Sequence, residues 1–273
     1  MSRIASCFQA LKAEGRTALI PYIVTGDPDI GVTVPLMHRM VRCGADIIEL
    51  GVPFSDPMSE GPVIQTAHER ALENGTSLRD AIAVVQEFRQ ENDTTPVLLM
   101  GYANPVERMG YAAFADTAAA AGVDALLTVD IPPEEVEAVN AELKRVGMDN
   151  IFLVAPTTPE ERVARITEAA SGFVYYVSVK GVTGSGNLDV EDVAKHVALI
   201  RDHTQLPVSV GFGIKDAASA GAVAGVADGV VVGSALVAAM YNAMQTDGNK
   251  EAAMHAVETL LSDIRKGIDS PTS

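Results

Sequence analysis

The sequence predicts a (β/α)8 TIM barrel preceded by an extra N-terminal helix. Short β-rich runs alternate with helix-period runs along the chain, eight β-rich runs can be counted, and the 273 residues suit a fold of about 250 residues. An open doubly wound sheet is the alternative, but it more often has about five or six strands and a GxGxxG sequence that this chain lacks. No linker or low-complexity tract divides the chain, so we expect one domain over residues 1–273.

The expected elements follow in chain order. The expected strands are runs rich in β-branched and aromatic residues. They are Thr17–Thr25, Ala45–Pro53, Pro96–Asn104, Val123–Asp130, Asn150–Ala155, Phe173–Val179, Leu206–Phe212 and Asp228–Val232. Helix-period runs between or after them are Leu78–Gln90, Tyr111–Ala121, Glu134–Val146, Pro159–Ala170, Val190–His203 and Glu251–Lys266. The extra helix, Ser2–Ala13, is amphipathic and is expected to plug the N-terminal mouth of the barrel.

Local signals refine several helix ends. Four glycines follow helical runs and are expected to take a positive φ there: Gly44, Gly122, Gly147 and Gly172. Thr158 precedes Pro159 and two glutamates, which predicts a helix N-cap at Thr158. Pro35 lies inside a helical run, where its missing N–H would interrupt the hydrogen bonds. A helix that begins at a Thr33 cap would place Pro35 in the first turn and remove this conflict.

Composition narrows the functional classes. A net charge of −16 disfavours nucleic acid and anionic membranes as partners, whereas backbone N–H groups could still hold one phosphate. The chain has neither an apolar run of about 20 residues nor a signal-peptide core at its start. Cys7 and Cys43 form no metal-binding or disulfide pattern, so we expect a cytoplasmic protein without a metal.

Glu49 is the strongest candidate for chemistry. Alternation along the second strand places Ile48 and Leu50 toward the helices, so Glu49 points into the barrel. Loss of hydration there should raise the pKa of its carboxyl group toward the range useful for proton transfer. The alternative is a structural Glu paired with Lys or Arg, but no strand interior offers such a partner.

A loop at the same end of the barrel carries further acids. The run from Phe54 to Pro62 is rich in Gly, Pro and Ser and contains Asp56 and Glu60, so it can close over the barrel mouth. A solvated loop acid is equally compatible with this spacing, although two carboxylates in different surroundings could divide acid and base roles. All five histidines lie in helical runs of the outer ring, solvated or partly buried, which argues against histidine catalysis.

Glycine-rich turns end the last three strands. They are Gly181–Gly186, Gly211–Gly213 and the pair Gly233-Ser234, which opens a helix. This fold often binds phosphate with its last loops and a helix N-terminus, so a phosphate site is expected here. Bulky inward residues at the strand ends could line an apolar slot for an aromatic substrate: Tyr22, Met100, Tyr102, Leu127, Val129, Leu153, Tyr175 and Phe212.

Several of these segments resemble one family. The runs Pro21–Pro28, Glu49–Pro57, Gly61–Gln65, Gly181–Gly184 and Val210–Ile214 are similar in sequence and spacing to the signatures of the tryptophan synthase α subunit. The resemblance covers about Leu11 to Ala239. It implies a lyase that splits indole-3-glycerol phosphate into indole and glyceraldehyde 3-phosphate without a cofactor of its own. A β-subunit partner, in an α2β2 complex, would hold pyridoxal phosphate and receive the indole.

The resemblance also implies roles for individual residues. Glu49 would be the general acid/base, Gly184, Gly213, Gly233 and Ser234 would hold phosphate, and Ile64 would join the indole pocket with the inward residues named above. The loops Phe54–Gly61 and Lys180–Asn187 would close the site, with Asp56 in the first and Thr183 tying them together.

Position 60 departs from the family, which has Asp there to hold the indole N–H. Glu60 keeps the charge, but a shift of about 1 Å can cost on the order of 10²-fold in rate unless the loop backbone compensates. Tyr22 adds a hydroxyl where Phe is usual. Two other functions stay open: a sugar-phosphate epimerase or another phosphate-binding barrel, although no inward His is present, and a barrel kept mainly to activate its partner.

Overall fold

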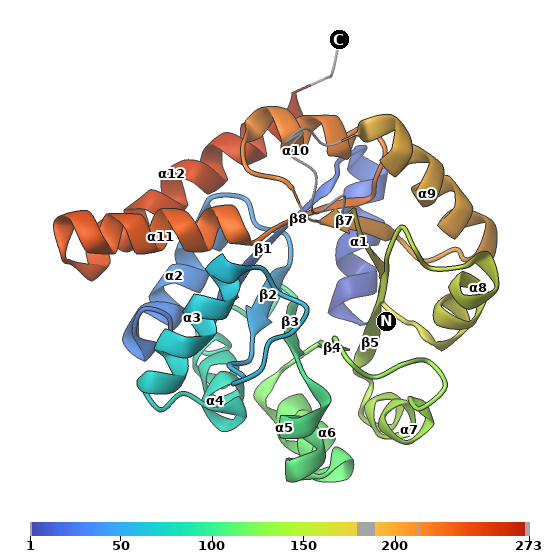
Figure 1. Ribbon diagram of the computed structural model, residues 1–273, viewed down its shortest axis with the longest axis horizontal. Coiled ribbons are helices and arrows are strands. Elements are labelled where there is room, and N and C mark those ends of the chain that lie inside the picture. Colours follow the sequence, from blue (N-terminus) through green and yellow to red (C-terminus); the bar gives the residue numbers. More distant parts are fainter. Residues whose placement is uncertain (1, 179–188, 212, 271–273) are drawn as a thin grey trace.

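The computed structural model describes residues 2–178, 189–211 and 213–270. Eight parallel strands close into one barrel in the order β1 to β8, each paired with its neighbours in sequence (Figure 1). The strands are β1 Ala18–Val24, β2 Ile48–Gly51, β3 Val97–Gly101, β4 Ala125–Thr128, β5 Asp149–Val154, β6 Val174–Val177, β7 Val208–Gly211 and β8 Gly229–Val232. Every expected strand is confirmed, and most of the strands are shorter than predicted.

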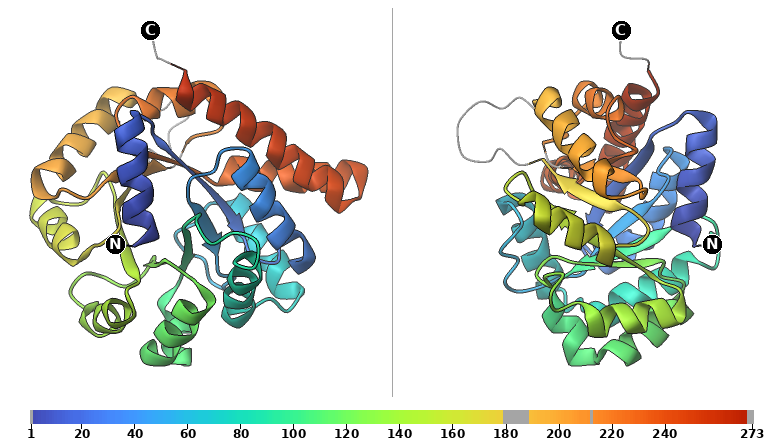
Figure 2. Two further views of the ribbon diagram at one scale, coloured as in Figure 1. Left: turned by 180° about the vertical axis from the view of Figure 1, so that it is seen from behind. Right: turned by 90° about the vertical axis from the view of Figure 1, so that its right-hand side faces the viewer.

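Helices surround the barrel, except for the first one, which lies across its N-terminal end (Figure 1 and Figure 2). They are α1 Arg3–Glu14, α2 Ile30–Arg42, α3 Pro62–Glu73, α4 Leu78–Phe88, α5 Ala103–Met109, α6 Tyr111–Ala121, α7 Glu137–Val146, α8 Glu160–Ala169, α9 Val190–His203, α10 Ala217–Ala224, α11 Ser234–Asp247 and α12 Lys250–Asp269. The four glycines predicted to have a positive φ all do. The predicted third strand ran too far, because α5 already begins at Ala103. Asp130 provides a reason, since its carboxylate accepts the Ala103 N–H and holds that backbone at the start of α5.

Two predicted helix caps are wrong. Thr33 does not begin α2, because its hydroxyl accepts a hydrogen bond from Gly26 N, and Asp29 caps a helix that starts earlier. Pro35 therefore lies inside α2, on its exposed side, where water can reach the carbonyl left without a helical partner. Thr158 does not cap α8, because its hydroxyl accepts from Ala155 N instead.

Helix α1 covers the N-terminal mouth of the barrel, as predicted. Seen from behind in Figure 2, it lies across the end at which the strands begin. Its buried residues Ile4, Phe8 and Leu11 pack with Ala18, Ile47 and other residues at the start of the strands. With that end filled, the open end is the one where the strands finish.

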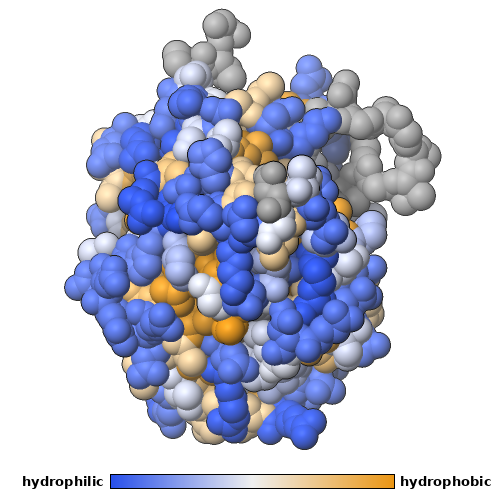
Figure 3. Space-filling view, turned by 90° about the vertical axis from the view of Figure 1, so that its left-hand side faces the viewer, coloured by the Kyte–Doolittle hydropathy of each residue, from blue (hydrophilic) through white to orange (hydrophobic). Residues whose placement is uncertain are grey.

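The remaining core lies between strands and helices. Residues in and directly beside β2 divide as expected, with Ile48, Leu50 and Val52 in the layer that packs on the helices and Ile47 inside the barrel. Helices α11 and α12 lie side by side and also pack on the barrel. The exterior is mostly polar, as Figure 3 shows for one face. Within the described ranges, no helix is long and apolar enough to cross a membrane.

Candidate active site

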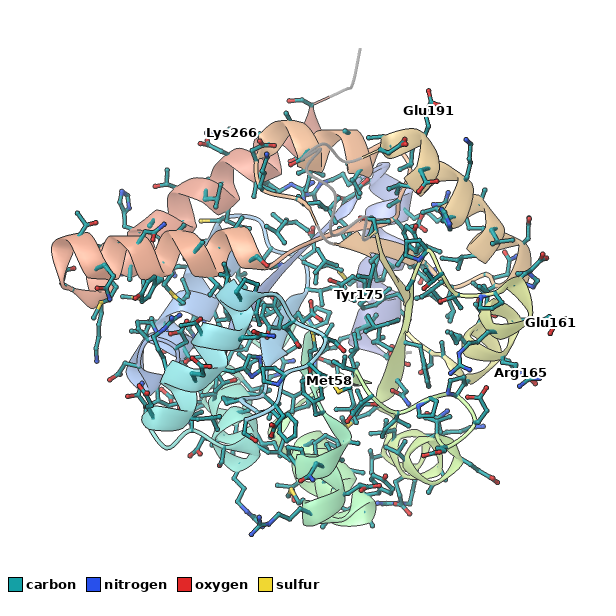
Figure 4. The ribbon with its side chains drawn as sticks, viewed as in Figure 1. Met58, Glu161, Arg165, Tyr175, Glu191 and Lys266 are labelled. Atoms are coloured by element: carbon teal, nitrogen blue, oxygen red, sulfur yellow. The ribbon has the colours of Figure 1, made fainter. Side chains whose placement is uncertain are left out.

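A cavity of about 330 Å³ opens where the strands end. Its lining joins residues that lie far apart in the sequence: Tyr22, Glu49, Glu60, Ile64, Met100, Tyr175, Gly213, Ile214, Val231, Gly233 and Ser234. In Figure 4, Tyr175 and Met58 lie over the central part of the barrel, whereas Glu161, Arg165, Glu191 and Lys266 project from the outer helices. Both predicted carboxylates and three of the four predicted phosphate residues therefore share one cavity.

Glu49 points into the barrel and is 1% exposed. Its Oε1 has no hydrogen-bond partner, and no Lys or Arg pairs with it, among the residues that the structure describes. Burial, with a smaller contribution from the nearby Glu60 charge, raises the pKa of the Glu49 carboxyl to about 8. At neutral pH this group therefore holds a proton that it can donate.

Glu60 lies in a more polar setting at the rim of the cavity. The Tyr102 hydroxyl donates to Glu60 Oε2 at 2.5 Å and accepts from Ser59 N at 3.2 Å. The Gln65 amide of α3 donates to the Glu60 backbone carbonyl at 2.9 Å. Burial raises the pKa of Glu60, and the Tyr102 hydrogen bond acts in the opposite direction by favouring the carboxylate. The two carboxyl groups thus meet different surroundings, as the sequence predicted.

Two tyrosines form the aromatic walls of the cavity. Tyr22 is the register partner of Glu49 on the neighbouring strand, and Tyr175 rises from β6. A Cβ at Gly51 would lie 2.4 Å from the Tyr22 hydroxyl, and one at Gly211 would lie 2.3 Å from the Tyr175 hydroxyl. Glycine at these two strand positions therefore makes room for the rings.

Gly233 and Ser234 lie where β8 passes into α11, as predicted. Helix α11 begins at Ser234, and both residues line the cavity with Gly213. The N–H groups of the first turn have no helical acceptor, and this end of the helix favours an anion. The end of the cavity formed by α11 can therefore bind a phosphate group.

A second cavity, of about 390 Å³, adjoins the first. The two share Glu60, Met100 and Tyr175, and the second continues along Val129 and Leu153 toward Pro132. The predicted indole residues are thus divided, with Tyr22 and Ile64 in the first cavity and Val129 and Leu153 in the second. This second cavity gives the inner site an apolar extension toward the loop after β4.

The other predicted site residues lie elsewhere. Leu127 is fully buried in the barrel interior, away from both cavity linings, because alternation indicates the side of a strand but not the depth. Tyr102 is buried behind Glu60. Asp56 is exposed on the segment after β2, where it accepts from the Ser55 hydroxyl at 2.6 Å. Thr183, Gly184 and Phe212, and the loop Lys180–Asn187, lie outside the described residues.

His68 was missed as a site neighbour. All five histidines lie in helices, as expected, but His68 is 1% exposed rather than solvated or partly buried. Its Nδ1 lies 3.0 Å from Phe54 N, and its Nε2 lies 3.3 Å from the Tyr22 hydroxyl. The four-residue spacing from Ile64 could have indicated that both face inward. Within the described ranges, no cluster of three His, Cys, Asp or Glu residues could hold a metal ion.

Fold and site together are those of a TIM barrel with a buried acid, tyrosine walls and a helix N-terminus in one cavity, which suits a lyase-type enzyme. Comparison with known proteins identifies the family. The tryptophan synthase alpha chain family matches residues 8–267. The alpha chain of Thiobacillus denitrificans is 58% identical over 270 residues, covering 99% of this chain and 97% of that one. The alpha chain of Thioalkalivibrio sulfidiphilus is 60% identical over 269 residues, covering 98% of this chain and 100% of that one.

Solved structures agree. The alpha subunit of Legionella pneumophila superposes with a TM-score of 0.92 at 42% identity, covering 98% of this chain and 99% of that one. A tryptophan synthase structure from M. tuberculosis gives a TM-score of 0.87 at 36% identity, covering 98% of this chain and 100% of that one. The chain belongs to the tryptophan synthase alpha chain family. It is a lyase of tryptophan biosynthesis that cleaves indole-3-glycerol phosphate. The family's alpha chain uses no cofactor, because pyridoxal phosphate belongs to the beta chain.

The buried acid predicts a pH-dependent stability. The Glu49 pKa is about 8 in the folded protein against 4.5 in the unfolded chain, so between these values the folded state keeps a proton that the unfolded state has released. This group therefore makes the protein less stable as pH rises from 4.5 to 8. We expect Glu49→Gln to raise Tm relative to wild type by roughly 5 °C more at pH 8 than at pH 5. Differential scanning calorimetry measures this, with the exposed Glu73→Gln as control; equal shifts at both pH values would contradict it.

Proposed function

We propose that Glu49 is the general acid/base of the cleavage reaction. Its protonated carboxyl would add a proton to indole C3, which moves positive charge onto the ring. The resulting Glu49 carboxylate would then take the proton of the hydroxyl on the adjoining carbon. As that C–O bond becomes C=O, the bond to C3 breaks and its electron pair returns to the ring. Indole and glyceraldehyde 3-phosphate are released, and Glu49 is again protonated. The observation that carries this proposal is the buried, unpaired carboxyl in the shared cavity.

Glu60 would be the second carboxylate, holding the indole N–H while positive charge develops on the ring. Its hydrogen bond from Tyr102 favours the charged form, which this role requires. These contacts support the proposal that the segment after β2 is adapted to Glu at position 60, whose side chain is longer than the Asp of the family. Gln65 binds the backbone carbonyl of Glu60, and Tyr102 binds its carboxylate.

The substrate would lie with its two ends at opposite parts of the cavity. Phosphate would bind at Gly213, Gly233 and Ser234, together with Gly184. The indole would lie among Tyr22, Ile64, Met100 and Tyr175, with Val129 and Leu153 of the second cavity beyond them. The resemblance also assigns Tyr102, Leu127 and Phe212 to this pocket. Asp56 and Thr183 would take part in loop closure.

A tryptophan synthase beta subunit would be the partner, in an α2β2 complex that receives the indole. The second cavity supports an apolar exit beside Glu60, and Met58, which precedes the lining residue Ser59 in the sequence, is 80% exposed on the segment after β2. A large exposed apolar side chain beside the cavity suits a docking surface.

The whole chain, residues 1–273, would work as one domain in the cytoplasm. Packing of α1 under the barrel and of α12 against α2, α10 and α11 supports one folding unit. Both cysteines are free thiols, as is usual in a reducing compartment.

Indole release from indole-3-glycerol phosphate tests the role of Glu49. We expect Glu49→Gln to lower kcat by about 10²–10⁴-fold, because the amide can neither give nor take the proton. The assay is run with and without a beta subunit, and Glu73→Gln is the control for the same substitution at an exposed site. Undiminished release from Glu49→Gln would refute the role. No release from the folded wild type, even with a beta subunit, would indicate a barrel kept to activate its partner.

Glu60→Asp tests whether the loop is adapted to Glu. We expect kcat to fall about 10-fold or more, because the shorter side chain moves the carboxylate away from the Tyr102 hydroxyl by about a bond length. Tyr102→Phe should produce a loss of similar size and little further loss when added to Glu60→Asp. A higher kcat for Glu60→Asp would mean that the loop has not compensated for the longer residue.

Met58→Lys tests the partner surface. A charge on this exposed side chain should weaken binding of a beta subunit about 10-fold and reduce its stimulation of indole release. Isothermal titration calorimetry measures the Kd. Leu72→Lys is the control, since Leu72 is also an exposed apolar residue but lies near the C-terminal end of α3, whereas Met58 precedes that helix. Equal Kd values for the two variants would mean that the beta subunit does not bind at the surface around Met58.

A further inference from the structure

The His68 imidazole is a buried polar group that the proposed proton transfers do not use. It lies on α3 with 1% exposure, and its two ring nitrogens contact two different segments. A backbone N–H can only donate, so Nδ1 accepts from Phe54 and carries no proton. Burial lowers the pKa of His68 to about 4, which keeps the ring neutral at physiological pH. The single ring proton therefore lies on Nε2, which donates to the Tyr22 hydroxyl oxygen.

Each of these contacts leads to the cavity. On the Nε2 side, Tyr22 forms a wall beside Glu49 and fits against Gly51. On the Nδ1 side, the ring of Phe54 stacks on Tyr102 with centroids 4.8 Å apart and planes 22° apart. The Tyr102 hydroxyl in turn donates to Glu60. The imidazole therefore lies between Tyr22, which forms a wall of the cavity, and the Phe54–Tyr102 pair, which contacts Glu60.

We infer that His68 is a positioning residue for the cleavage reaction, acting through Phe54 and Tyr102 on Glu60 and through Tyr22 on the wall of the aromatic pocket. The inference rests on the role proposed above for Glu60. The Phe54 contact controls kcat, because it places the loop that carries Glu60. The Tyr22 contact controls KM, because it fixes the ring against which the substrate lies.

The two contacts can be removed separately. In His68→Asn the shorter side chain can place its amide oxygen where Nδ1 accepts from Phe54, but it cannot reach Tyr22. In His68→Gln the longer side chain can place its amide N–H where Nε2 donates to Tyr22, but it has no acceptor at the Nδ1 position. A residue that only fills space would not distinguish these variants in this way.

Steady-state cleavage of indole-3-glycerol phosphate gives the first readout. We expect His68→Gln to lower kcat about 10-fold with KM nearly unchanged, and His68→Asn to raise KM about 3-fold with kcat nearly unchanged. Tyr22→Phe should reproduce the KM effect and add little to His68→Asn, because both remove the same hydrogen bond. His38→Asn and His38→Gln are the matched controls, since His38 lies on α2 against Phe88, outside the site. Equal kcat and KM changes in the two His68 variants would overturn the inference.

Two further readouts do not depend on activity. Hydrogen exchange of the Phe54 amide should be about 10-fold faster in His68→Gln than in His68→Asn, because only the former loses its acceptor. Nitrogen-15 NMR of the wild-type imidazole should show the proton on Nε2 at pH 7; a proton on Nδ1 would overturn the inference even if a variant fails to fold. Should Glu60→Gln leave kcat unchanged, the role of Glu60 fails, while exchange and tautomer still report separately on the contacts of His68.

Discussion

Closure of eight parallel strands in one register determines where every group of the site can lie. The register sets Tyr22 beside Glu49 and Glu49 beside Leu98, so these side chains must share the barrel interior. Space there is limited because α1 already fills the opposite end. A large ring fits only where a neighbouring strand has no Cβ, as Gly51 provides for Tyr22. Since the outer helices cover the other face of each strand, the inward groups have little freedom to move apart.

The unpaired carboxyl of Glu49 follows from this closure. A charge in such a place is penalised, and a nearby cation would relieve the penalty, but it would also lower the carboxyl pKa and remove the proton needed at neutral pH. Among the described residues the barrel offers no such cation, and the second acid, Glu60, raises the Glu49 pKa further. The acid is therefore held in its protonated form at a cost in stability that the rest of the core must offset.

Periodicity and turn chemistry predict the backbone here better than they predict side-chain partners. The alternation of Ile48, Glu49 and Leu50 was enough to place the acid, and the step from Gly233 to Ser234 was enough to place the start of α11. Pro35 was misplaced because the hydroxyl of Thr33 accepts from the amide of Gly26 in the preceding loop rather than capping its own helix. The contact between His68 and Tyr22 joins residues 46 positions apart in the sequence, on α3 and β1, which no local pattern encodes.

Helix α3 makes several of the long-range contacts that local sequence patterns do not predict. Its Ile64 lines the cavity, its Gln65 holds the Glu60 carbonyl, and its Arg70 forms a bidentate pair with the buried Asp27 in the loop after β1. Ile64 and His68 are four residues apart and so face the site together. One rigid element therefore contacts the first strand, the loop after it and the segment that bears the second acid. Glu60 is held at two points, because the Gln65 amide donates to its backbone carbonyl and the Tyr102 hydroxyl donates to its carboxylate. The distance between these two donors determines whether a Glu side chain, which is longer than Asp, fits the site.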